Sequence, residues 1–528
     1  MPIHGQNIIA GDLAAENQKV YQATDPTNGD VLDGSFHFAS DTELDAAVVT
    51  ADLAAKEMRF LPASRRSALL RSMAREIEAI GDELIARCMS ETGLPEGRLV
   101  GERGRTTNQL RMFADLVDEG SWVDARIDTA DPDRTPVPKP DVRRMLISIG
   151  PVAVFCASNF PLAFSVAGGD TASAIAAGCG VVIKAHSSHP GTAEIVATAL
   201  TRAIESEGMP KGAISLVHGS GRSIGTALVR HRLIKAVGFT GSRTGGRALF
   251  DAAASRPEPI PVYAEMGSSN PVFVLPGALA SRSDAIAEGL KNSVILGAGQ
   301  FCTNPGLVVG MKSTDMSRFI DRSGKLISEA AAAPMLNGRI HEAYVAAVER
   351  LKNSAGVSVE GESDGASSPN LGVPTILSTD ASTFMANQSL ASEVFGPSTL
   401  VVEGSTRESI LEVAESMEGH LTATIHGTEE DLESFRDLVT ILERKVGRII
   451  FNGFPTGVEV CSSMNHGGPY PASSDSHFTS VGTAAIYRFT RPICYQGFPD
   501  AQLPPELQNS NPRSLYRIVN SGGGRDSL

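Results

Sequence analysis

Apolar residues recur at helical spacing in the first quarter of the chain and predict three helices there. The first is expected from Asp41 to about Phe60, and the second from Ser64 to about Glu91 with Ser64 as its N-cap. Thr92-Gly93-Leu94-Pro95 then ends the second helix, because Gly and Pro interrupt helical backbone. A third, polar helix is expected from about Arg98 to Asp118. The apolar positions of the two stronger patterns are Leu44, Val48, Leu53, Met58, Leu69, Leu70, Met73, Ile77, Ile80, Leu84 and Ile85.

Beyond residue 150 the pattern changes to short apolar runs separated by helical stretches. Apolar strands that alternate with helices indicate a parallel β-sheet covered by helices on both faces. Such sheets bind ligands at the carboxyl ends of their strands, where Asn159, Lys184 and the Gly241-Ser242 turn are expected. This half has neither a GxxxxGK[ST] loop nor a strict GxGxxG motif. The expected strands span 152–156, 181–185, 213–217, 234–239 and 261–264, and helices begin near 162, 191, 221 and 242.

A second α/β unit follows, with strands expected near residues 271–275, 307–311, 398–403 and 448–452. A stretch rich in Gly, Ser and acidic residues, between 354 and 369, predicts a surface loop. Residues 131–140 contain four prolines, which predicts an extended arm leading into an apolar strand at 145–149. The polar, Gly-rich residues 521–528 are expected to be frayed.

Length, charge and cysteine usage restrict the class of protein. A chain of 528 residues exceeds the size of about 250–300 residues at which single cores stop growing, so two large lobes are expected. The net charge of −14 opposes binding to nucleic acid or to an anionic membrane surface. The six cysteines form no CxxC pair, which favours reduced thiols and a cytoplasmic location. No leader pattern and no apolar run approaching about 18 residues is present, so the chain is expected to be neither secreted nor membrane-spanning.

One cysteine has the sequence surroundings of a presented thiol. Cys302 lies between Gly297-Ala298-Gly299 and Asn304-Pro305-Gly306, where the backbone can approach a substrate and turn away sharply. A thiol nucleophile needs an acceptor for its proton and a donor for the oxyanion that it forms. The alternative is that Cys302 is an ordinary buried small hydrophobe. His466 and His186 have no partners at metal-ligand spacing, so no metal site is expected and a metal-free covalent mechanism fits best.

Three further polar residues are candidates for the same site. Asn159, at a strand end before Phe160-Pro161, could donate a side-chain N–H, or alternatively cap a turn or helix. Glu265, at a strand end beside Gly267, could act as a general base with a raised pKa, or alternatively be a solvated loop carboxylate. Glu393 is the third candidate.

Six short motifs occur in order along nearly the whole chain. They are Ser158-Asn159-Phe160-Pro161, Val182-Ile183-Lys184, Phe239-Thr240-Gly241-Ser242, Glu265-Met266-Gly267, Gly299-Gln300-Phe301-Cys302 and Glu393-Val394-Phe395-Gly396-Pro397. In order and spacing they resemble the motif series of the aldehyde dehydrogenase superfamily. Residues 101–106, 157–170 and 457–461 resemble more closely the bacterial 2,5-dioxovalerate (α-ketoglutaric semialdehyde) dehydrogenases. A branch of fatty-aldehyde dehydrogenases shares several of these segments.

The resemblance implies an α/β fold with two Rossmann-like lobes, one for the cofactor and one catalytic, plus a small β oligomerisation arm. In the implied reaction Cys302 attacks the aldehyde, and Asn159 and the Cys302 backbone N–H hold the oxyanion. Glu265 then activates water to hydrolyse a thioester. The implied domains are 1–137 and 151–266, with part of 455–482, for the cofactor; 267–454 for catalysis; 138–150 and 483–500 for the oligomerisation arm; and 501–528 for a C-terminal tail.

The resemblance also implies NAD or NADP as the cofactor. Glu393 would bind the nicotinamide ribose, Lys184 the adenosine ribose, and Ser242 the pyrophosphate at a helix N-terminus, with Phe395 beside the nicotinamide. Ser187 stands where the family often has a glutamate that binds the adenosine-ribose hydroxyls. Because a carboxylate that would repel a 2′-phosphate is missing, we expect NADP to be accepted. The full expected cofactor set is Lys184, Ser187, Gly241, Ser242, Gly246, Glu393 and Phe395.

The implied substrate is a short carboxylated semialdehyde, whose carboxylate needs a cationic partner. Arg105 is expected to line the aldehyde channel, with a surface salt bridge as its alternative role. Phe160, Ala167, Thr456 and Val458 are expected in the channel wall. Two other functions stay open: NADP-dependent oxidation of long-chain aliphatic aldehydes, and a catalytically silent cofactor-binding scaffold. The expected assembly is a homodimer or homotetramer.

Overall fold

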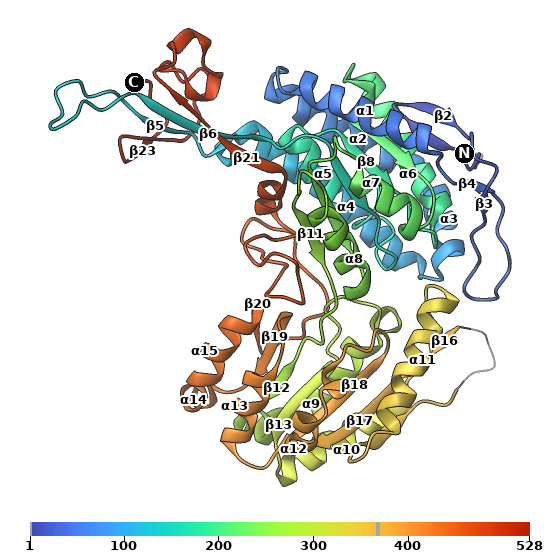
Figure 1. Cartoon of the computed structure of the whole chain (residues 1–528). Helices are drawn as coiled ribbons and strands as arrows, with labels where there is room; N and C mark the ends of the chain where they lie inside the picture. The colour runs from blue at the N-terminus through green and yellow to red at the C-terminus, as the bar shows by residue number, and fades with distance from the viewer. Residues whose placement is uncertain (1–2, 366–369) are drawn as a thin grey trace.

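Two seven-stranded sheets and one five-stranded sheet organise the chain into two lobes and a projecting arm (Figure 1). The computed structural model describes residues 3–365 and 370–528. In Figure 1 the first lobe lies at the top, the second lies below it, and the arm extends to the upper left. The α/β class expected from the sequence is confirmed.

The first lobe is built on a doubly wound sheet. Five adjacent strands run parallel, and two short strands extend the sheet antiparallel at one edge. Because these five strands are parallel, their carboxyl ends, which include Lys184 and Glu265, lie at one edge of the sheet. All five strands predicted here are present. In spatial order the strands are β11 (Val262–Glu265), β10 (Ala236–Thr240), β7 (Val152–Phe155), β8 (Val181–Lys184), β9 (Ile214–Val217), β1 (Asn7–Ile9) and β2 (Asp12–Ala14).

Both faces of this sheet are covered by helices. The first and third residues of β7 pack in a core with α5 and α6, and the second and fourth pack in a core with α7 and α8. This arrangement explains why the strands read as continuous apolar runs rather than as alternating ones. The four helices are α5 (Gly169–Ala177), α6 (Pro190–Ser206), α7 (Thr226–Arg230) and α8 (Arg243–Ala254).

The second lobe contains the other seven-stranded sheet, in which only β15 is antiparallel to its neighbour. The four predicted strands correspond to β12, β13, β18 and β20, whereas β15, β17 and β19 were not predicted. β15 falls within the stretch predicted as a loop, of which residues 366–369 lie outside the described part. In spatial order the strands are β15 (Ser358–Glu362), β17 (Thr375–Asp380), β18 (Ser398–Gly404), β13 (Leu307–Met311), β12 (Val272–Val274), β19 (His420–His426) and β20 (Val446–Phe451).

The arm is a five-stranded sheet in which two long strands pair antiparallel over seven residues, Thr490 lying opposite Ser148. The expectation that residues 521–528 are frayed is wrong, because β23 pairs with β22 at the edge of this sheet. In spatial order the strands are β21 (Thr490–Gln496), β6 (Val142–Ser148), β5 (Arg126–Asp128), β22 (Arg517–Val519) and β23 (Gly522–Gly524). The domain boundaries inferred from the sequence stay a prediction.

The long helix predicted over residues 64–91 is two helices in the structure. α2 (Ala63–Ile80) and α3 (Asp82–Thr92) are separated by Gly81, whose φ of +69° is incompatible with a continuous helix. Ser64 is not the N-cap of α2, because Pro62 holds that position. The apolar spacing continues through the break, so the pattern of apolar residues alone does not reveal it.

The other predicted helices differ only in their ends. α1 (Asp41–Met58) and α4 (Glu96–Glu119) confirm two of them. α5 begins at Gly169 rather than near residue 162, because residues 161–168 form turns. A Cβ atom on Gly168 would lie 2.6 Å from the carbonyl oxygen of Ala163, so these turns are tightly packed.

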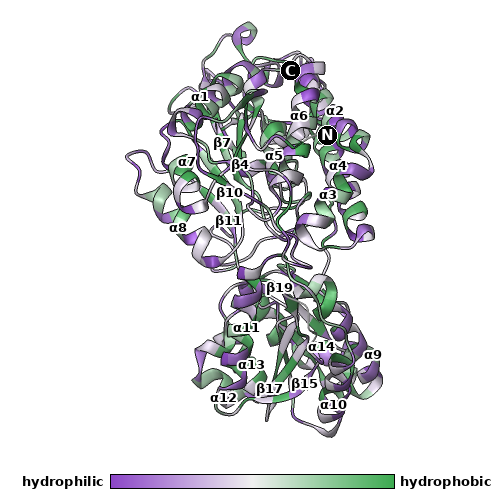
Figure 2. Ribbon diagram, turned by 90° about the vertical axis from the view of Figure 1, so that its right-hand side faces the viewer, coloured by the Kyte–Doolittle hydropathy of each residue, from purple (hydrophilic) through white to green (hydrophobic). Residues whose placement is uncertain are grey.

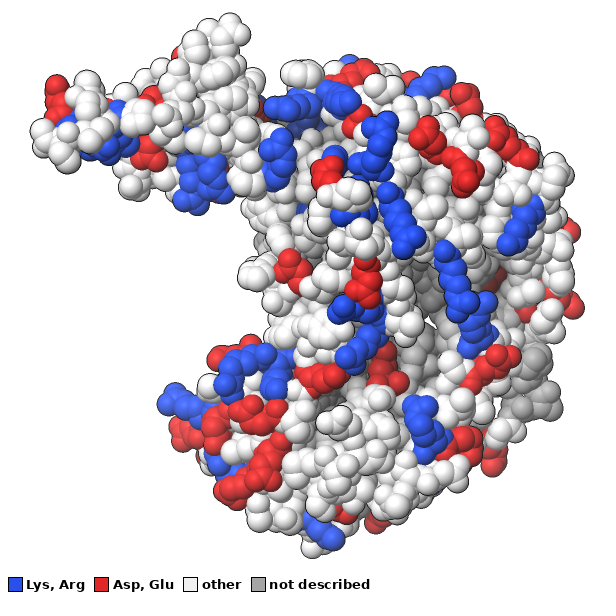
Figure 3. All heavy atoms as spheres, in the orientation of Figure 1, with Lys and Arg blue, Asp and Glu red and all other residues white. Residues whose placement is uncertain are grey.

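Acidic and basic side chains are interspersed on the face of the molecule shown in Figure 3. In Figure 2 the helices of both lobes combine hydrophobic and hydrophilic segments, as expected for helices with one face against a sheet. Within the described residues, no helix is both long and apolar enough to span a bilayer.

Candidate active site

The thiol of Cys302 is presented by a tight loop between α9 (Pro276–Ile295) and β13. The short helix η4 (Leu296–Gly299) leads into the loop and ends at Gly299, whose φ is +65°. A Cβ atom on Gly299 would lie 2.2 Å from the carbonyl carbon of Gly396, so only glycine fits without moving the backbone. Cys302 itself is partly buried.

Cys302 lies beside a histidine and a glutamate that come from distant parts of the chain. Its Sγ is 3.4 Å from Nε2 of His466, and the same nitrogen is 3.0 Å from Oε1 of Glu265. The hydroxyl of Ser480 donates a hydrogen bond of 2.5 Å to Oε2 of Glu265. Glu265 ends β11, whereas His466 and Ser480 follow β20. The structure therefore brings Glu265 and Cys302 together, as predicted, and adds a histidine between them.

The pKa values of this cluster differ from the sequence-based expectation. Burial raises the pKa of the Glu265 carboxyl, but His466 and the Ser480 hydroxyl lower it more, so the pKa lies below its ordinary value. The predicted raised pKa of Glu265 is therefore wrong. Burial, together with the negative charge of Glu265, raises the pKa of the Cys302 thiol well above its ordinary value. At neutral pH the carboxylate is ionised and the resting thiol is protonated.

Asn159 is bonded directly to the thiol loop. Its Nδ2 donates a hydrogen bond of 3.0 Å to the carbonyl oxygen of Gln300, two residues before Cys302. A carboxamide has two N–H donors, so this bond occupies one of them. The contact joins a residue that follows β7 of the first lobe to the loop of the second lobe.

Asn270 supports the loop from behind and was not identified from the sequence. Its Nδ2 donates to the carbonyl oxygens of Cys302 and Asn304, both at 2.9 Å. Its Oδ1 accepts hydrogen bonds from Ser268 and Thr422 at 2.9 and 3.0 Å. Asn270 is fully buried with a φ of +45°, and Asn is among the residues that adopt this backbone most readily. An Asn-Pro pair in a sequence indicates a turn and gives no sign of this bonding.

A buried glutamate on α4 anchors the segment after Asn159. Oε1 of Glu102 accepts hydrogen bonds of 2.9 Å from the backbone N–H groups of Leu162 and Ala163. Its other oxygen pairs with the Arg98 guanidinium at 3.1 Å. Although α4 is a polar helix, Glu102 is only 3% exposed and therefore does not belong to a solvated charged face.

Arg105 lies one helical turn further along the same face of α4. Its Cζ is 5.6 Å from the ring centre of Phe160 and 5.4 Å from that of Phe164. Nε and Nη2 of Arg105 are buried and make no hydrogen bond with any described residue. Burial lowers the pKa of Arg105, although Glu102 and the Cys302 thiolate would raise it. The guanidinium is therefore an unpaired cation near the thiol, and the alternative of a surface salt bridge is not seen.

The aromatic rings complete this side of the site. Phe160 packs edge-on against Phe301, with ring centres 5.3 Å apart, and Phe301 immediately precedes Cys302. Arg98 stacks over both rings, at 4.4 and 4.8 Å. Phe160 therefore lies beside the thiol loop.

The other residues predicted for the channel wall differ in how exposed they are. Thr456 hydrogen-bonds to Ser293 of α9 through its hydroxyl, and Val458 is partly exposed. Ala167 is 1% exposed and packs in the core of the first lobe, rather than at an open wall. A second arginine, Arg448 of β20, was missed by the sequence analysis. Its buried Nε has no hydrogen-bond partner in the described chain, and a Cys302 thiolate would raise its pKa against the effect of burial.

Five of the seven predicted cofactor residues come from the first lobe, on or after strands β8 and β10. The Lys184 side chain is buried, which lowers its pKa to about 8, and its ammonium makes no hydrogen bond with a described residue. Ser187 is exposed in the turn that follows β8. Ser242 caps α8 by accepting from the N–H of Gly245, and the turn from Gly241 is exposed. A Cβ atom on Gly246 would lie 2.8 Å from Met266, so a glycine is needed where α8 packs on the end of β11.

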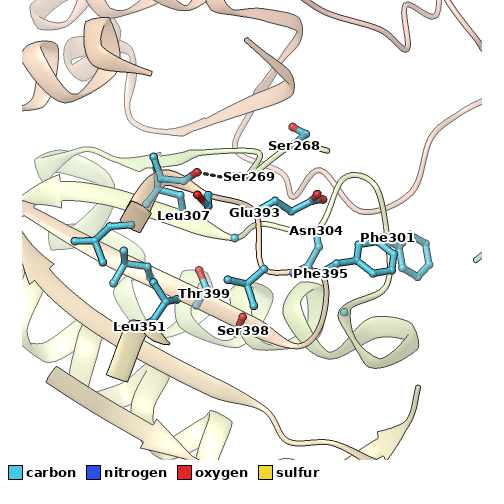
Figure 4. Close-up of a pocket in the computed structure, with 17 residues that line it drawn as sticks. Ser268, Ser269, Phe301, Asn304, Leu307, Leu351, Glu393, Phe395, Ser398 and Thr399 are labelled. Carbon is cyan, nitrogen blue, oxygen red and sulfur yellow. Dashed lines mark hydrogen bonds between the residues drawn. The ribbon is translucent and has the colours of Figure 1, made fainter. Parts of the chain in front are cut away.

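Glu393 and Phe395 come from the second lobe and line a narrow slot beside Phe301. The slot has a volume of about 20 Å³, which is room for about one water, so it is no substrate cavity. In Figure 4 the Glu393 carboxylate points away from the apolar end of the slot at Leu307 and Leu351. Burial raises the pKa of Glu393 to about 7, and a Cβ atom on Gly267 would lie 2.3 Å from its Oε2.

Comparisons with known proteins agree with this arrangement. The model of the aldehyde dehydrogenase family matches residues 13–490. "Alpha-ketoglutaric semialdehyde dehydrogenase 2" of Azospirillum brasilense is 47% identical over 519 residues, 98% of this chain and 99% of that protein. The "Alpha-ketoglutaric semialdehyde dehydrogenase" of Acinetobacter baylyi is 43% identical over 518 residues, 98% of each chain.

Solved structures show the same fold. A 3,6-anhydro-L-galactose dehydrogenase in complex with NAP has a TM-score of 0.80 at 22% identity, over 93% of this chain and 99% of that one. The NAD⁺ complex of a Bacillus cereus aldehyde dehydrogenase has a TM-score of 0.79 at 20% identity, over 93% of this chain and 96% of that one. At these identities the likeness concerns the fold alone.

Proposed function

Since the chain belongs to the aldehyde dehydrogenase family, whose members oxidise aldehydes with NAD(P), we propose that its substrate is α-ketoglutaric semialdehyde and its product 2-oxoglutarate. The observation behind the substrate is the 47% identity to the Azospirillum enzyme over nearly the full length of both chains. The unpaired Arg105 guanidinium near Cys302 supports it independently, because this semialdehyde is anionic.

The proposed reaction begins at Cys302. The Sγ atom attacks the aldehyde carbon to form a thiohemiacetal, and its proton passes to Nε2 of His466, 3.4 Å away, which returns it to the sulfur when the thioester is hydrolysed. The second N–H of Asn159 donates to the oxyanion, while the bond to Gln300 fixes the amide. Bound NAD(P) supplies a two-electron acceptor for the oxidation, which leaves a thioester on Cys302.

Hydrolysis of the thioester is assigned to Glu265. Its carboxylate is ionised at neutral pH, so it can take a proton from water that attacks the thioester carbon. The Ser480 hydroxyl and His466 orient the carboxylate from two sides. The products are the carboxylic acid and the free Cys302 thiol.

The residues at the cofactor positions fit a dinucleotide. The exposed N-terminus of α8 at Ser242 suits a pyrophosphate, and the unpaired Lys184 ammonium suits ribose hydroxyls. Glu393 would accept hydrogen bonds from the nicotinamide ribose, because Gly267 leaves room for its carboxylate. Phe395 lines the same slot as Glu393 and would pack beside the nicotinamide.

Arg105 is assigned to the carboxylate of the substrate. Replacing it with methionine should raise KM for α-ketoglutaric semialdehyde by roughly 10- to 100-fold, with a smaller change in kcat, because a charge-assisted hydrogen bond is lost. Steady-state kinetics of Arg105→Met measure the effect. The control is Arg111→Met on the same helix, where the guanidinium pairs with Glu78 near the surface. An unchanged KM in Arg105→Met removes Arg105 from substrate binding and directs attention to Arg448.

The substrate itself is tested by comparing turnover of α-ketoglutaric semialdehyde and a medium-chain alkanal. The proposal predicts a kcat/KM for the semialdehyde at least about tenfold higher, since one well-placed charged contact contributes about 1.5–3 kcal/mol. A preference for the alkanal would favour the fatty-aldehyde alternative. No turnover of either aldehyde by protein that binds NAD(P) would favour the scaffold alternative.

We further propose that NADP is accepted, because Ser187 brings no negative charge to the adenosine side. Ser187→Glu should lower kcat/KM for NADP at least tenfold and leave that for NAD within about threefold, since a carboxylate repels a 2′-phosphate but accepts from a 2′-hydroxyl. Ser187→Gln is the control, because glutamine has the size of glutamate but no charge. If wild-type protein prefers NAD by a hundredfold or more, the proposed acceptance of NADP is wrong.

The arm is proposed to join copies of the chain into a homodimer or homotetramer in the cytoplasm. Within the described residues β21 pairs only with β6, so its outer edge is available to a second chain. Analytical ultracentrifugation at micromolar concentration tests this. A monomer at all concentrations contradicts it.

A further inference from the structure

Three potential metal ligands converge at the thiol. The ligand atoms of Glu265, Cys302 and His466 all lie within 4.8 Å of one another. A tetrahedral zinc ion, with bonds of about 2.3 Å to sulfur and about 2.0–2.1 Å to nitrogen and oxygen, needs S–N and N–O separations of roughly 3.6 and 3.4 Å. The corresponding distances here are 3.4 Å and 3.0 Å. Two of the three separations are therefore within about 0.4 Å of those of a tetrahedral site, and the third, from sulfur to carboxylate oxygen, is at most 4.8 Å.

The chemistry of the three groups suits zinc. Thiolate, imidazole and carboxylate are the ligands that Zn²⁺ takes in proteins. Glu265 and His466 are 4% and 1% exposed, and Oε1 of Glu265 makes no aligned hydrogen bond within the described chain. Elsewhere in the described residues, no other group of three such side chains is placed to hold a metal.

We propose that Cys302, His466 and Glu265 form an inhibitory Zn²⁺ site, with water as the fourth ligand. On binding, the Cys302 thiol gives one proton to solvent and becomes a thiolate ligand, with no change in oxidation state. The bound ion would coordinate the Cys302 sulfur, which otherwise attacks the aldehyde. It would also coordinate the Glu265 carboxylate, which otherwise activates water. Inhibition is therefore reversible by a chelator, and it competes with the aldehyde.

Binding is measured directly, without substrate, so the outcome does not depend on which aldehyde the enzyme oxidises. The full-length protein is titrated with Zn²⁺ against a chromogenic chelator, and with Co²⁺ while the thiolate-to-cobalt absorption is recorded. The proposal predicts one ion per chain, the thiolate band in the wild-type protein, and full recovery of activity with EDTA. Cys302→Ser should abolish the band, and both it and His466→Gln should weaken Zn²⁺ binding at least a hundredfold.

Matched controls use a thiol and an imidazole from elsewhere on the surface. Cys494→Ser and His477→Asn change exposed residues outside the site and should bind Zn²⁺ as the wild-type protein does. The proposal is overturned if the Co²⁺ complex of the wild-type protein lacks the thiolate band. It is also overturned if Cys302→Ser binds Zn²⁺ as tightly as the wild-type protein, or if Cys494→Ser or His477→Asn removes the binding. Because the spectrum of the wild-type protein alone can refute it, the test does not depend on any variant folding.

Discussion

Alanine in place of Cys302 is expected to reduce aldehyde oxidation by roughly 10⁴-fold or more, because no other group can form the covalent intermediate. The loss should appear in kcat rather than in the affinity for NAD(P), since Cys302 is assigned to chemistry. Steady-state assays measure the activity, and mass spectrometry of acid-quenched protein detects the acyl adduct, which should be absent. Cys461→Ala and Cys494→Ala are the thiol-loss controls and should retain activity. Activity retained in Cys302→Ala would refute the covalent mechanism.

The pKa of Cys302 gives this prediction a pH dependence. Because burial and Glu265 hold the thiol pKa well above its ordinary value, the reactive thiolate is a small fraction at neutral pH and grows as pH rises. The rate of Cys302 alkylation by iodoacetamide should therefore rise about tenfold per pH unit between about pH 7 and 9. A plateau that begins below pH 8 would mean that the pKa is depressed, opposite to the structure.

Glu265→Gln should have the second largest effect, with steady-state turnover reduced by roughly 10²- to 10⁴-fold. An amide cannot accept the proton of the attacking water, so the thioester should form and then persist. The expected result is a burst of reduced cofactor of about one per active site, followed by slow turnover, with the acyl-enzyme visible by mass spectrometry. Alkylation of Cys302 at neutral pH should become faster, because the charge that raises its pKa is removed.

Glu393→Gln is the matched control for the loss of a carboxylate in the same site. It should raise KM for NAD(P) without accumulation of the acyl-enzyme, since Glu393 is assigned to the ribose. If Glu265→Gln shows no burst and no acyl-enzyme, Glu265 acts before the thioester forms, and its assignment to hydrolysis is wrong.

The sequence predicted the sheet of the first lobe well because its strands are short, apolar and regularly spaced. It placed Cys302, Glu265 and Asn159 through their motifs, and the structure brings these three within one site. Their catalytic roles stay predictions. The strands β17 and β19 were not predicted, because polar residues interrupt their apolar positions: β17 reads Thr-Ile-Leu-Ser-Thr-Asp and β19 reads His-Leu-Thr-Ala-Thr-Ile-His.

The histidine at the site could not be found by local reasoning. His466 contacts Cys302 across 164 residues of sequence, and no neighbour at ligand or triad spacing identifies it. Asn270 was missed for a related reason, because three of its hydrogen bonds, to Cys302, Asn304 and Thr422, reach segments that approach it only in the folded chain. Contacts of this kind depend on how the loops fold back on one another, and the spacing of apolar residues along the chain carries no information about that.

Glu102 and Arg105 lie on neighbouring turns of α4 and have different roles. Glu102 anchors the backbone that follows Phe160, whereas Arg105 lies near the thiol and its buried Nε and Nη2 have no hydrogen-bond partner in the described chain. A library that varies position 105 and keeps Glu102 would therefore change the charge offered to an incoming aldehyde while the loop stays anchored. The helix α4 is thus a natural starting point for directed evolution toward uncharged aldehydes.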